Sequence, residues 1–96
     1  MSERRVIMHG IDHEGPEPVY RQLAVIVAAR IESGQLAPGR PIPSETQLCQ
    51  EFGVSRGTAR KAVGLLREDG LVFTVRGRGT YVTAREHTTT DRPRQK

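Results

Sequence analysis

Two short amphipathic segments are separated by Phe52-Gly53-Val54-Ser55, and this spacing is the strongest constraint on the fold. Gly53 allows a sharp reversal of the chain, and Ser55 is a residue type that caps helix N-termini. Val54 can pack into the core between the two segments. The pattern is typical of a helix-turn-helix, whose second helix enters the major groove of DNA.

Three helices are predicted from apolar residues at helical spacing and from the residues at their ends. The first begins near Pro18 and ends at Gly34. The second opens at Ser44, whose distance to Gln47 is that of a capping box. The third covers about residues 55–69. Its predicted apolar stripe consists of Ala59, Ala62, Val63 and Leu66.

After the third helix the apolar period changes from helical to alternating. Residues 71–76 and 80–83 are predicted to be two antiparallel strands joined by a turn at Gly77-Arg78-Gly79. The order helix, helix, helix, hairpin predicts an α+β fold. That fold is a winged helix-turn-helix, in which three helices are followed by a two-stranded β-hairpin wing.

The length of 96 residues suits one domain, predicted over residues 18–83. Residues 1–17 are predicted to be a flexible N-terminal segment. Val6, Ile7 and Met8 could form a short strand, but no convincing pairing partner lies nearby. Residues 84–96 lack apolar periodicity and are predicted to be a disordered basic tail.

Charge and cysteine usage narrow the class of protein. The chain has 15 Lys and Arg against 11 Asp and Glu, a formal charge of +4. A basic balance favours a polyanion partner, although a basic surface also serves solubility. Cys49 is the single cysteine, which fits a reducing cytoplasm. The longest apolar run, residues 23–29, is too short to cross a membrane, and no secretory signal is visible. A cytoplasmic location is therefore expected.

The third predicted helix carries the residue types that read DNA. Arg56 and Arg60 are four residues apart, so they share one helix face. Arginine reads guanine O6 and N7 with two hydrogen bonds. Gly57 removes side-chain bulk between them. Arg76 and Arg78 are two cations at the tight wing turn, where they can lie along phosphates or enter a minor groove. The alternative is a solvated helix face with ordinary surface charges.

The order and spacing of these motifs resemble the GntR family of bacterial transcription regulators over about residues 18–83. The resemblance rests on the segments 18–23, 31–39, 43–45, 52–63, 69–72 and 77–82. It implies a winged helix that binds operator DNA as a dimer, with repression as the default. It also implies DNA contacts for Arg56, Arg60, Arg76 and Gly77. Ser44, the helix cap, is expected to contact a phosphate, and Thr58 is expected to contact the DNA backbone as well.

The complete set of candidate DNA-binding residues follows from both arguments together. It consists of Ser44, Thr46, Ser55, Arg56, Gly57, Thr58, Arg60, Lys61, Arg76, Gly77 and Arg78. Many family members carry a basic residue where this chain has Thr46, so one contact is expected to be missing there. Family members usually continue into an effector-binding domain that this sequence lacks, which leaves a minimal regulator or a fragment as alternatives. No small-molecule effector is therefore assigned.

Other classes of function receive less support. A winged helix that docks a protein partner would show an exposed apolar patch. No catalytic constellation supports an enzyme, and no stacking platforms support RNA binding. His9, His13 and His87 are scattered and lack metal-ligand spacing, so neither a metal nor a cofactor is expected.

Overall fold

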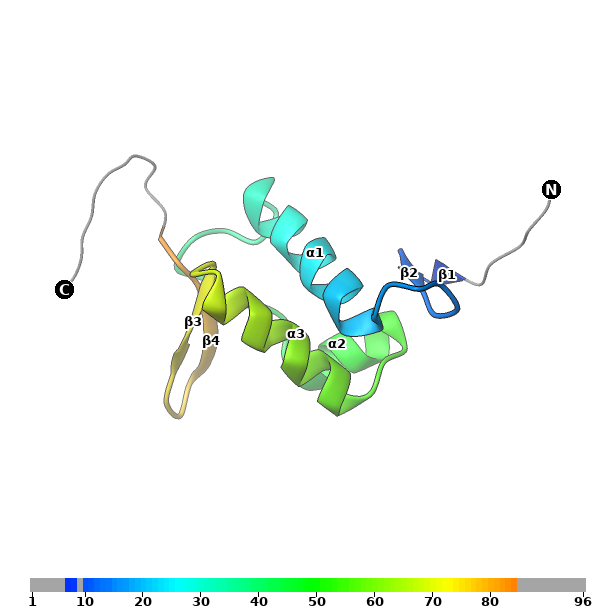
Figure 1. Cartoon of the computed structure of the whole chain (residues 1–96). Helices are drawn as coiled ribbons and strands as arrows, with labels where there is room; N and C mark the ends of the chain where they lie inside the picture. Colours follow the sequence, from blue (N-terminus) through cyan, green and yellow to red (C-terminus); the bar gives the residue numbers. More distant parts are fainter. Residues whose placement is uncertain (1–6, 9, 85–96) are drawn as a thin grey trace.

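The computed structural model describes residues 7–8 and 10–84 of the chain. Three helices are followed by an antiparallel pair of strands, which confirms the predicted α+β winged helix-turn-helix. The elements in chain order are β1 (Ile7–Met8), β2 (Ile11–Asp12), α1 (Val19–Glu32), α2 (Glu45–Phe52), α3 (Arg56–Glu68), β3 (Val72–Val75) and β4 (Gly79–Val82). Figure 1 shows the β3–β4 wing at the C-terminal end of α3, on the opposite side of the molecule from β1 and β2.

The helix ends form where the sequence predicts them. Pro18 precedes α1, and Ser44 and Gln47 form both hydrogen bonds of the capping box at α2. Gly53 ends α2 in the left-handed conformation, at φ 68°, which an L side chain rarely adopts. The Ser55 hydroxyl accepts the Thr58 backbone N–H at the start of α3. Short-range hydrogen bonds therefore set the turn that orients α3.

One hydrophobic core lies between the three helices and the base of the wing. The α3 helix packs against both α1 and α2. Its buried face consists of Ala59, Ala62 and Leu66, and Val63 is only half-buried beside it. Small alanine side chains let neighbouring helices approach closely, so α3 is held firmly with its opposite face in solvent. The fully buried larger side chains are Ile11, Leu23, Val27, Leu48, Phe52, Leu66, Val72 and Val82.

The α1–α2 connection adds a third extended segment to the wing. Pro41 and Pro43 predict extended backbone there, but the sequence does not predict that it pairs with the wing. Strands β3 and β4 pair with Val72 opposite Val82 and Phe73 opposite Tyr81. On the other edge of β4, the Ile42 N–H donates to the Thr80 carbonyl at 2.9 Å. The Val82 N–H donates to the Arg40 carbonyl, also at 2.9 Å. These bonds tie the α1–α2 connection to the wing and fix the wing relative to the start of α2.

The sequence predicts that residues 1–17 form a flexible segment, and within this segment the structure contains packed elements that the composition does not reveal. Strand β1 pairs with β2, so Ile7 and Met8 do have a partner strand. Ile11 is fully buried in the core. The Asp12 backbone N–H donates to Gln22 Oε1 at 2.7 Å, and Gln22 Nε2 donates to the Asp12 carbonyl at 3.0 Å. Burial of one large apolar side chain, with these hydrogen bonds, outweighs the local turn-forming composition.

Two further expectations concern the basic tail at residues 84–96 and the absence of a membrane-crossing segment. Residues 1–6, 9 and 85–96 are outside the described residues, and with them most of the segment predicted to be a basic tail. Within residues 10–84, none of the helices has the length and apolar character needed to cross a membrane.

Candidate nucleic-acid interface

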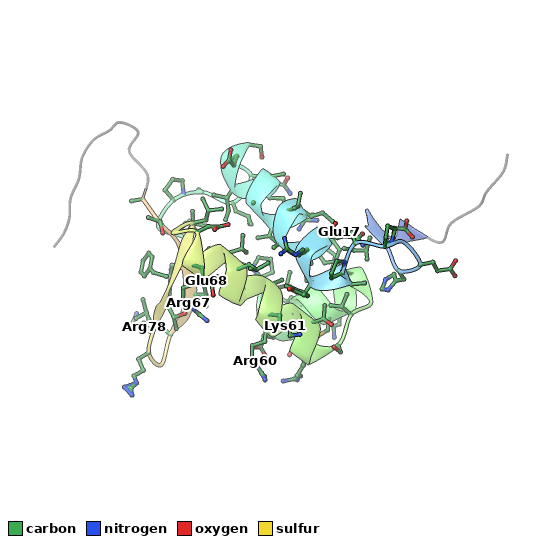
Figure 2. The ribbon with its side chains drawn as sticks, in the orientation of Figure 1. Glu17, Arg60, Lys61, Arg67, Glu68 and Arg78 are labelled. Atoms are coloured by element: carbon green, nitrogen blue, oxygen red, sulfur yellow. The ribbon has the colours of Figure 1, made fainter. Side chains whose placement is uncertain are left out.

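The outward face of α3 carries the arginines that were predicted to read DNA. Arg56, Gly57, Arg60 and Lys61 are all exposed. This face lies opposite the buried alanines, because a helix with 3.6 residues per turn separates positions 57, 60 and 61 from positions 59, 62 and 66. Figure 2 shows Arg60 and Lys61 on α3, and Arg78 on the neighbouring wing. The fold therefore presents these side chains to a partner.

Arg60 forms a two-pronged ion pair with Glu45, the first residue of α2. Its Nε and Nη2 atoms lie 3.0 Å from the two carboxylate oxygens of Glu45. The hydrogen bonds from Arg60 lower the pKa of Glu45 below its ordinary value. The carboxylate in turn raises the pKa of Arg60. Both groups therefore stay charged at neutral pH.

This ion pair uses only one edge of the Arg60 guanidinium. A guanidinium has five N–H donors, and Glu45 takes the Nε hydrogen and one Nη2 hydrogen. The edge formed by Nη1 and the second Nη2 hydrogen remains available, and the Arg60 side chain is 65% exposed. Glu45 thus orients a planar fork whose outer edge can bind two acceptors at once.

The remaining candidates at the N-terminal end of α3 make local hydrogen bonds. Arg56 Nη2 lies 3.4 Å from the Thr46 hydroxyl, a long bond that links α3 to α2. The Ser55 hydroxyl donates to the Thr58 hydroxyl at 3.0 Å while it caps the helix. The Thr58 hydroxyl hydrogen is therefore still able to reach an outside acceptor. Gly57 has no contact closer than 3.9 Å where a Cβ would stand, so internal packing does not require a glycine.

Lys61 takes a direction that its sequence position does not reveal. Its Nζ lies 5.0 Å from the centre of the Tyr20 ring on α1, within the range of a cation–π contact. Tyr20 is half-buried, which agrees with edge packing. Lys61 therefore lies on the flank of α3 toward α1, whereas Arg60 lies on the flank toward α2 and the wing.

A groove of about 640 Å³ runs between the start of α2, the outer side of α3 and the wing. Three of the predicted contact residues, Ser44, Arg60 and Arg78, line it. The Ser44 hydroxyl accepts the Gln47 N–H at 3.1 Å and keeps its own hydrogen for another acceptor. Arg76 and Gly77 are on the wing tip outside this lining, and both are exposed.

The groove also contains residues that the sequence analysis missed. Arg67 Nη1 donates to the Thr74 hydroxyl at 2.7 Å, and this hydroxyl lies 3.5 Å from the Thr80 hydroxyl. Arg67 follows Arg60 by seven residues, a spacing that places both on one helix face and could have identified it. Thr74 and Thr80 could not be assigned in this way, because the facing of the wing strands depends on their register.

Within the described part of the chain, no group of three or more His, Cys, Asp and Glu side chains is placed to hold a metal ion. Cys49 is a half-buried free thiol. His9 and His87 fall outside the described residues. Apart from the Glu45 carboxylate, which is paired with Arg60, the polar groups at the groove are guanidinium, hydroxyl and amide groups, which suit an anionic partner.

The model of the family described as "Bacterial regulatory proteins, gntR family" matches residues 19–82. The chain belongs to the GntR family. The matched region contains all three helices, the wing and every predicted contact residue. It begins after residues 10–17, so Ile11 and the β2 strand lie outside the matched region.

The relatives of known name include two repressors. The chain is 38% identical over 73 residues to the HTH-type transcriptional repressor NagR of Bacillus subtilis, a match over 76% of this chain and 30% of NagR. It is 44% identical over 68 residues to the mannosyl-D-glycerate transport/metabolism system repressor MngR of Escherichia coli, over 71% of this chain and 28% of MngR. The chain thus spans less than a third of the length of these relatives.

Solved structures of the same fold include DNA complexes. The crystal structure of AraR(DBD) in complex with operator ORX1 has a TM-score of 0.71 and 37% identity, covering 81% of this chain and 99% of that one. YtrA from Sulfolobus acidocaldarius, a GntR-family transcription factor, has a TM-score of 0.66 and 34% identity, covering 79% and 64%. The helices and the wing therefore have the arrangement of this family.

Proposed function

We propose that this chain is a sequence-specific DNA-binding transcriptional regulator that recognises an operator and represses transcription. The observation that carries the proposal is the Arg60 fork, held at one edge by Glu45 and open at the other. Its support from relatives is the AraR(DBD) complex with operator DNA and the repressors NagR and MngR.

The α3 helix enters the major groove with its N-terminal half foremost in this proposal. Arg60 presents its open edge to guanine O6 and N7, the pair of acceptors that best fits a guanidinium fork. Arg56 reaches a neighbouring base or phosphate on the same helix face. Gly57 lets the helix backbone come close to the base edges, because no side chain stands between the two arginines.

Contacts with DNA phosphates lie on either side of these base contacts in the proposal. Ser44 and Thr58 each keep a hydroxyl hydrogen that can be donated to a phosphate oxygen. Lys61 meets the backbone on the α1 flank of α3, and Arg76 and Arg78 follow the backbone or the minor groove from the wing. With about 5 to 7 phosphates neutralised by the cationic side chains of the bound protein, the slope of log affinity against log salt is about −5 to −6.

The protein works as a homodimer on its operator, formed at the latest when DNA is bound. Two copies would place two α3 helices in successive major grooves, about 34 Å apart, so the operator would contain two related half-sites. The regulator would act in the cytoplasm, where it meets the nucleoid. No effector is assigned, because the proposed contacts account for the groove as a DNA surface.

A protein-docking role receives no comparable support. Among the described residues, the large hydrophobic side chains with high exposure are Val25 on α1 and Phe73 on the wing, at 67% and 44%. They lie on different elements, Val25 on a helix and Phe73 on a strand. Scattered exposed apolar residues are normal on a soluble surface. The gathered arginines, in contrast, need an anionic partner.

The test is to select binding duplexes from a random DNA pool with the full chain, and then to measure affinity by fluorescence anisotropy. The selected duplex is compared with a scrambled duplex of equal composition, at low and at physiological salt. We expect a preference of about 10³-fold or more at physiological salt. Failure of the selection to enrich any sequence, with equal affinity for all duplexes, would refute sequence-specific regulation by this chain.

A further inference from the structure

The Arg67 side chain crosses from α3 to the wing in the groove described above. One of its five N–H groups is donated to the Thr74 hydroxyl at 2.7 Å. Thr74 in turn lies 3.5 Å from Thr80 on the neighbouring strand, with either hydroxyl able to be the donor. The guanidinium is therefore fixed at one point, and Arg67 is among the residues that line the groove. Figure 2 shows Arg67 between α3 and the wing.

The charge around Arg67 differs from that around Arg60. The Arg60 guanidinium is paired with Glu45, whereas none of the ion pairs among residues 10–84 includes Arg67. Three arginines line the groove, Arg60, Arg67 and Arg78, and Glu45 is the single acidic residue that lines it. Neither Arg67 nor Arg78, at the end of the groove near the wing, is thus in an ion pair with a carboxylate of the described chain. A fixed, unpaired guanidinium is well suited to an anion.

We propose that the groove between α3 and the wing seats one phosphate of the DNA backbone, with Arg67 as its anchoring donor and Thr74 as the residue that positions Arg67. The inference rests on the proposed function and adds a contact to it. The planar fork of arginine matches two phosphate oxygens, and hydroxyl groups are frequent additional phosphate donors. Arg67 lies seven residues beyond Arg60 on the same helix. In this proposal Arg67 contacts the DNA backbone and Arg60 contacts a base.

The position of Thr74 explains how the contact gains geometric precision. A free arginine side chain on a helix surface has many rotamers and loses this freedom when it binds. The hydrogen bond to Thr74 restricts Arg67 before DNA arrives, so less freedom is lost on binding. It also joins the wing to α3, so that the phosphate seat keeps its shape only while both elements hold their relative position.

The first experiment compares Arg67→Gln with the wild-type chain on the selected duplex across a salt series. We expect affinity at low salt to fall about tenfold, because a charge-assisted contact is lost. The log–log salt slope is expected to become shallower by about 0.9 for each bound copy, and so by about 1.8 for a dimer on its operator, because each copy loses one phosphate contact. The matched control is Arg21→Gln, because Arg21 is an exposed arginine on α1 away from the groove, and it is expected to change neither quantity.

The second experiment separates the positioning residue from the anchoring residue. Thr74→Val keeps the shape of the side chain and removes its hydroxyl. It is expected to weaken binding about threefold without changing the salt slope, because the charge of Arg67 remains. The double variant is expected to bind like Arg67→Gln alone, since Thr74 acts through Arg67. Thermal unfolding by circular dichroism confirms that each variant is folded.

A third experiment identifies the phosphate itself. Duplexes with one neutral methylphosphonate at the same backbone position in each half-site, moved through successive positions, are bound by wild-type and Arg67→Gln proteins. At one position the difference between the two proteins is expected to vanish, because the partner charge is gone. A difference that persists at every position, or an unchanged salt slope, would overturn the phosphate seat even though the selected duplex is still preferred. Loss of that preference in the wild-type chain would instead refute the proposed function itself.

Discussion

The two faces of α3 differ in exposure and in role, because one packs in the core and the other faces solvent. The inward face consists of Ala59, Ala62 and Leu66, all between 0% and 1% exposed, and it packs against α1 and α2. The outward face carries Arg60, which is 65% exposed and paired only at its edge. One face therefore holds the fold together and the other is available for a partner. Substitutions on the two faces should affect different measurable quantities.

Leu66→Ala should disrupt the packing of the inward face and give the largest change in stability of the variants considered. It removes a fully buried side chain from the centre of the core, so we expect a loss of about 3 kcal/mol in the free energy of unfolding. Urea denaturation followed by circular dichroism measures this loss. The adjacent Leu65 is half-buried, and Leu65→Ala is the matched control, expected to cost clearly less. Equal losses for the two variants would show that α3 does not pack as described.

Arg60→Ala should leave the fold intact and remove base reading. Affinity for the selected duplex is expected to fall by about 10- to 100-fold, while the affinity for scrambled DNA falls far less. Thermal unfolding should be nearly unchanged, because the side chain is exposed. Arg21→Ala, which removes the same charge from α1, serves as the control. If Arg60→Ala weakened both duplexes equally, Arg60 would contact phosphate and not a base.

Glu45→Gln sharpens the comparison within the outward face itself. The variant removes the charge that orients Arg60 and retains one acceptor oxygen. We expect the preference for the selected duplex to fall by about fivefold, the scale of an exposed ion pair. Affinity for scrambled DNA should rise slightly, because a negative charge near the backbone is removed. An unchanged preference would show that Arg60 reaches its base without help from Glu45.

The same ion pair predicts a dependence of stability on pH. The Arg60 hydrogen bonds lower the pKa of Glu45 in the folded chain relative to its ordinary value of 4.5. The stabilising contribution is therefore fully present above pH 4.5 and is lost as the pH falls through the lowered folded pKa. Thermal melts of wild type and Glu45→Gln should differ by a constant amount at neutral pH and converge in acid. Divergence in acid would contradict this sign.

The sequence predicts the parts of the fold that depend on near neighbours. The capping box at Ser44, the end of α2 at Gly53 and the cap at Ser55 are all confirmed. Each is a hydrogen bond or a backbone conformation that spans three or four residues. Periodicity likewise places the inward face of α3, apart from Val63, which is only half-buried.

Features that depend on distant partners could not be predicted in this way. Ile11 is buried because α1 and the rest of the core form a site for it, and its own neighbourhood reads as a turn-rich segment. The hydrogen bond of Ile42 to Thr80 joins positions far apart in the chain. The hydrogen bonds that pair Arg60 with Glu45 and Arg67 with Thr74 also depend on how the helices and the wing pack together. Candidate residue types were visible, but their pairing was not.

The glycines of α3 give the finest test of the comparison between its faces. Gly57 and Gly64 both have helical backbones with room for a Cβ, and alanine is the better helix former. Each Gly→Ala change is therefore expected to stabilise the fold by about 0.4–1 kcal/mol. Only Gly57→Ala should weaken binding to the selected duplex, by a few-fold, because a methyl group then stands between Arg56 and Arg60 at the base edges.

Gly64→Ala is the matched control for this last effect. It makes the same chemical change about two helical turns nearer the wing, where α3 is expected to leave the major groove. Urea denaturation of both variants and anisotropy with the selected duplex provide the two measurements. A gain in stability with reduced affinity in Gly57→Ala alone would mean that the glycine is retained for close approach to DNA. If both variants bound like wild type, the helix would stand farther from the bases than proposed, and Arg60 would have to span that distance through its side chain.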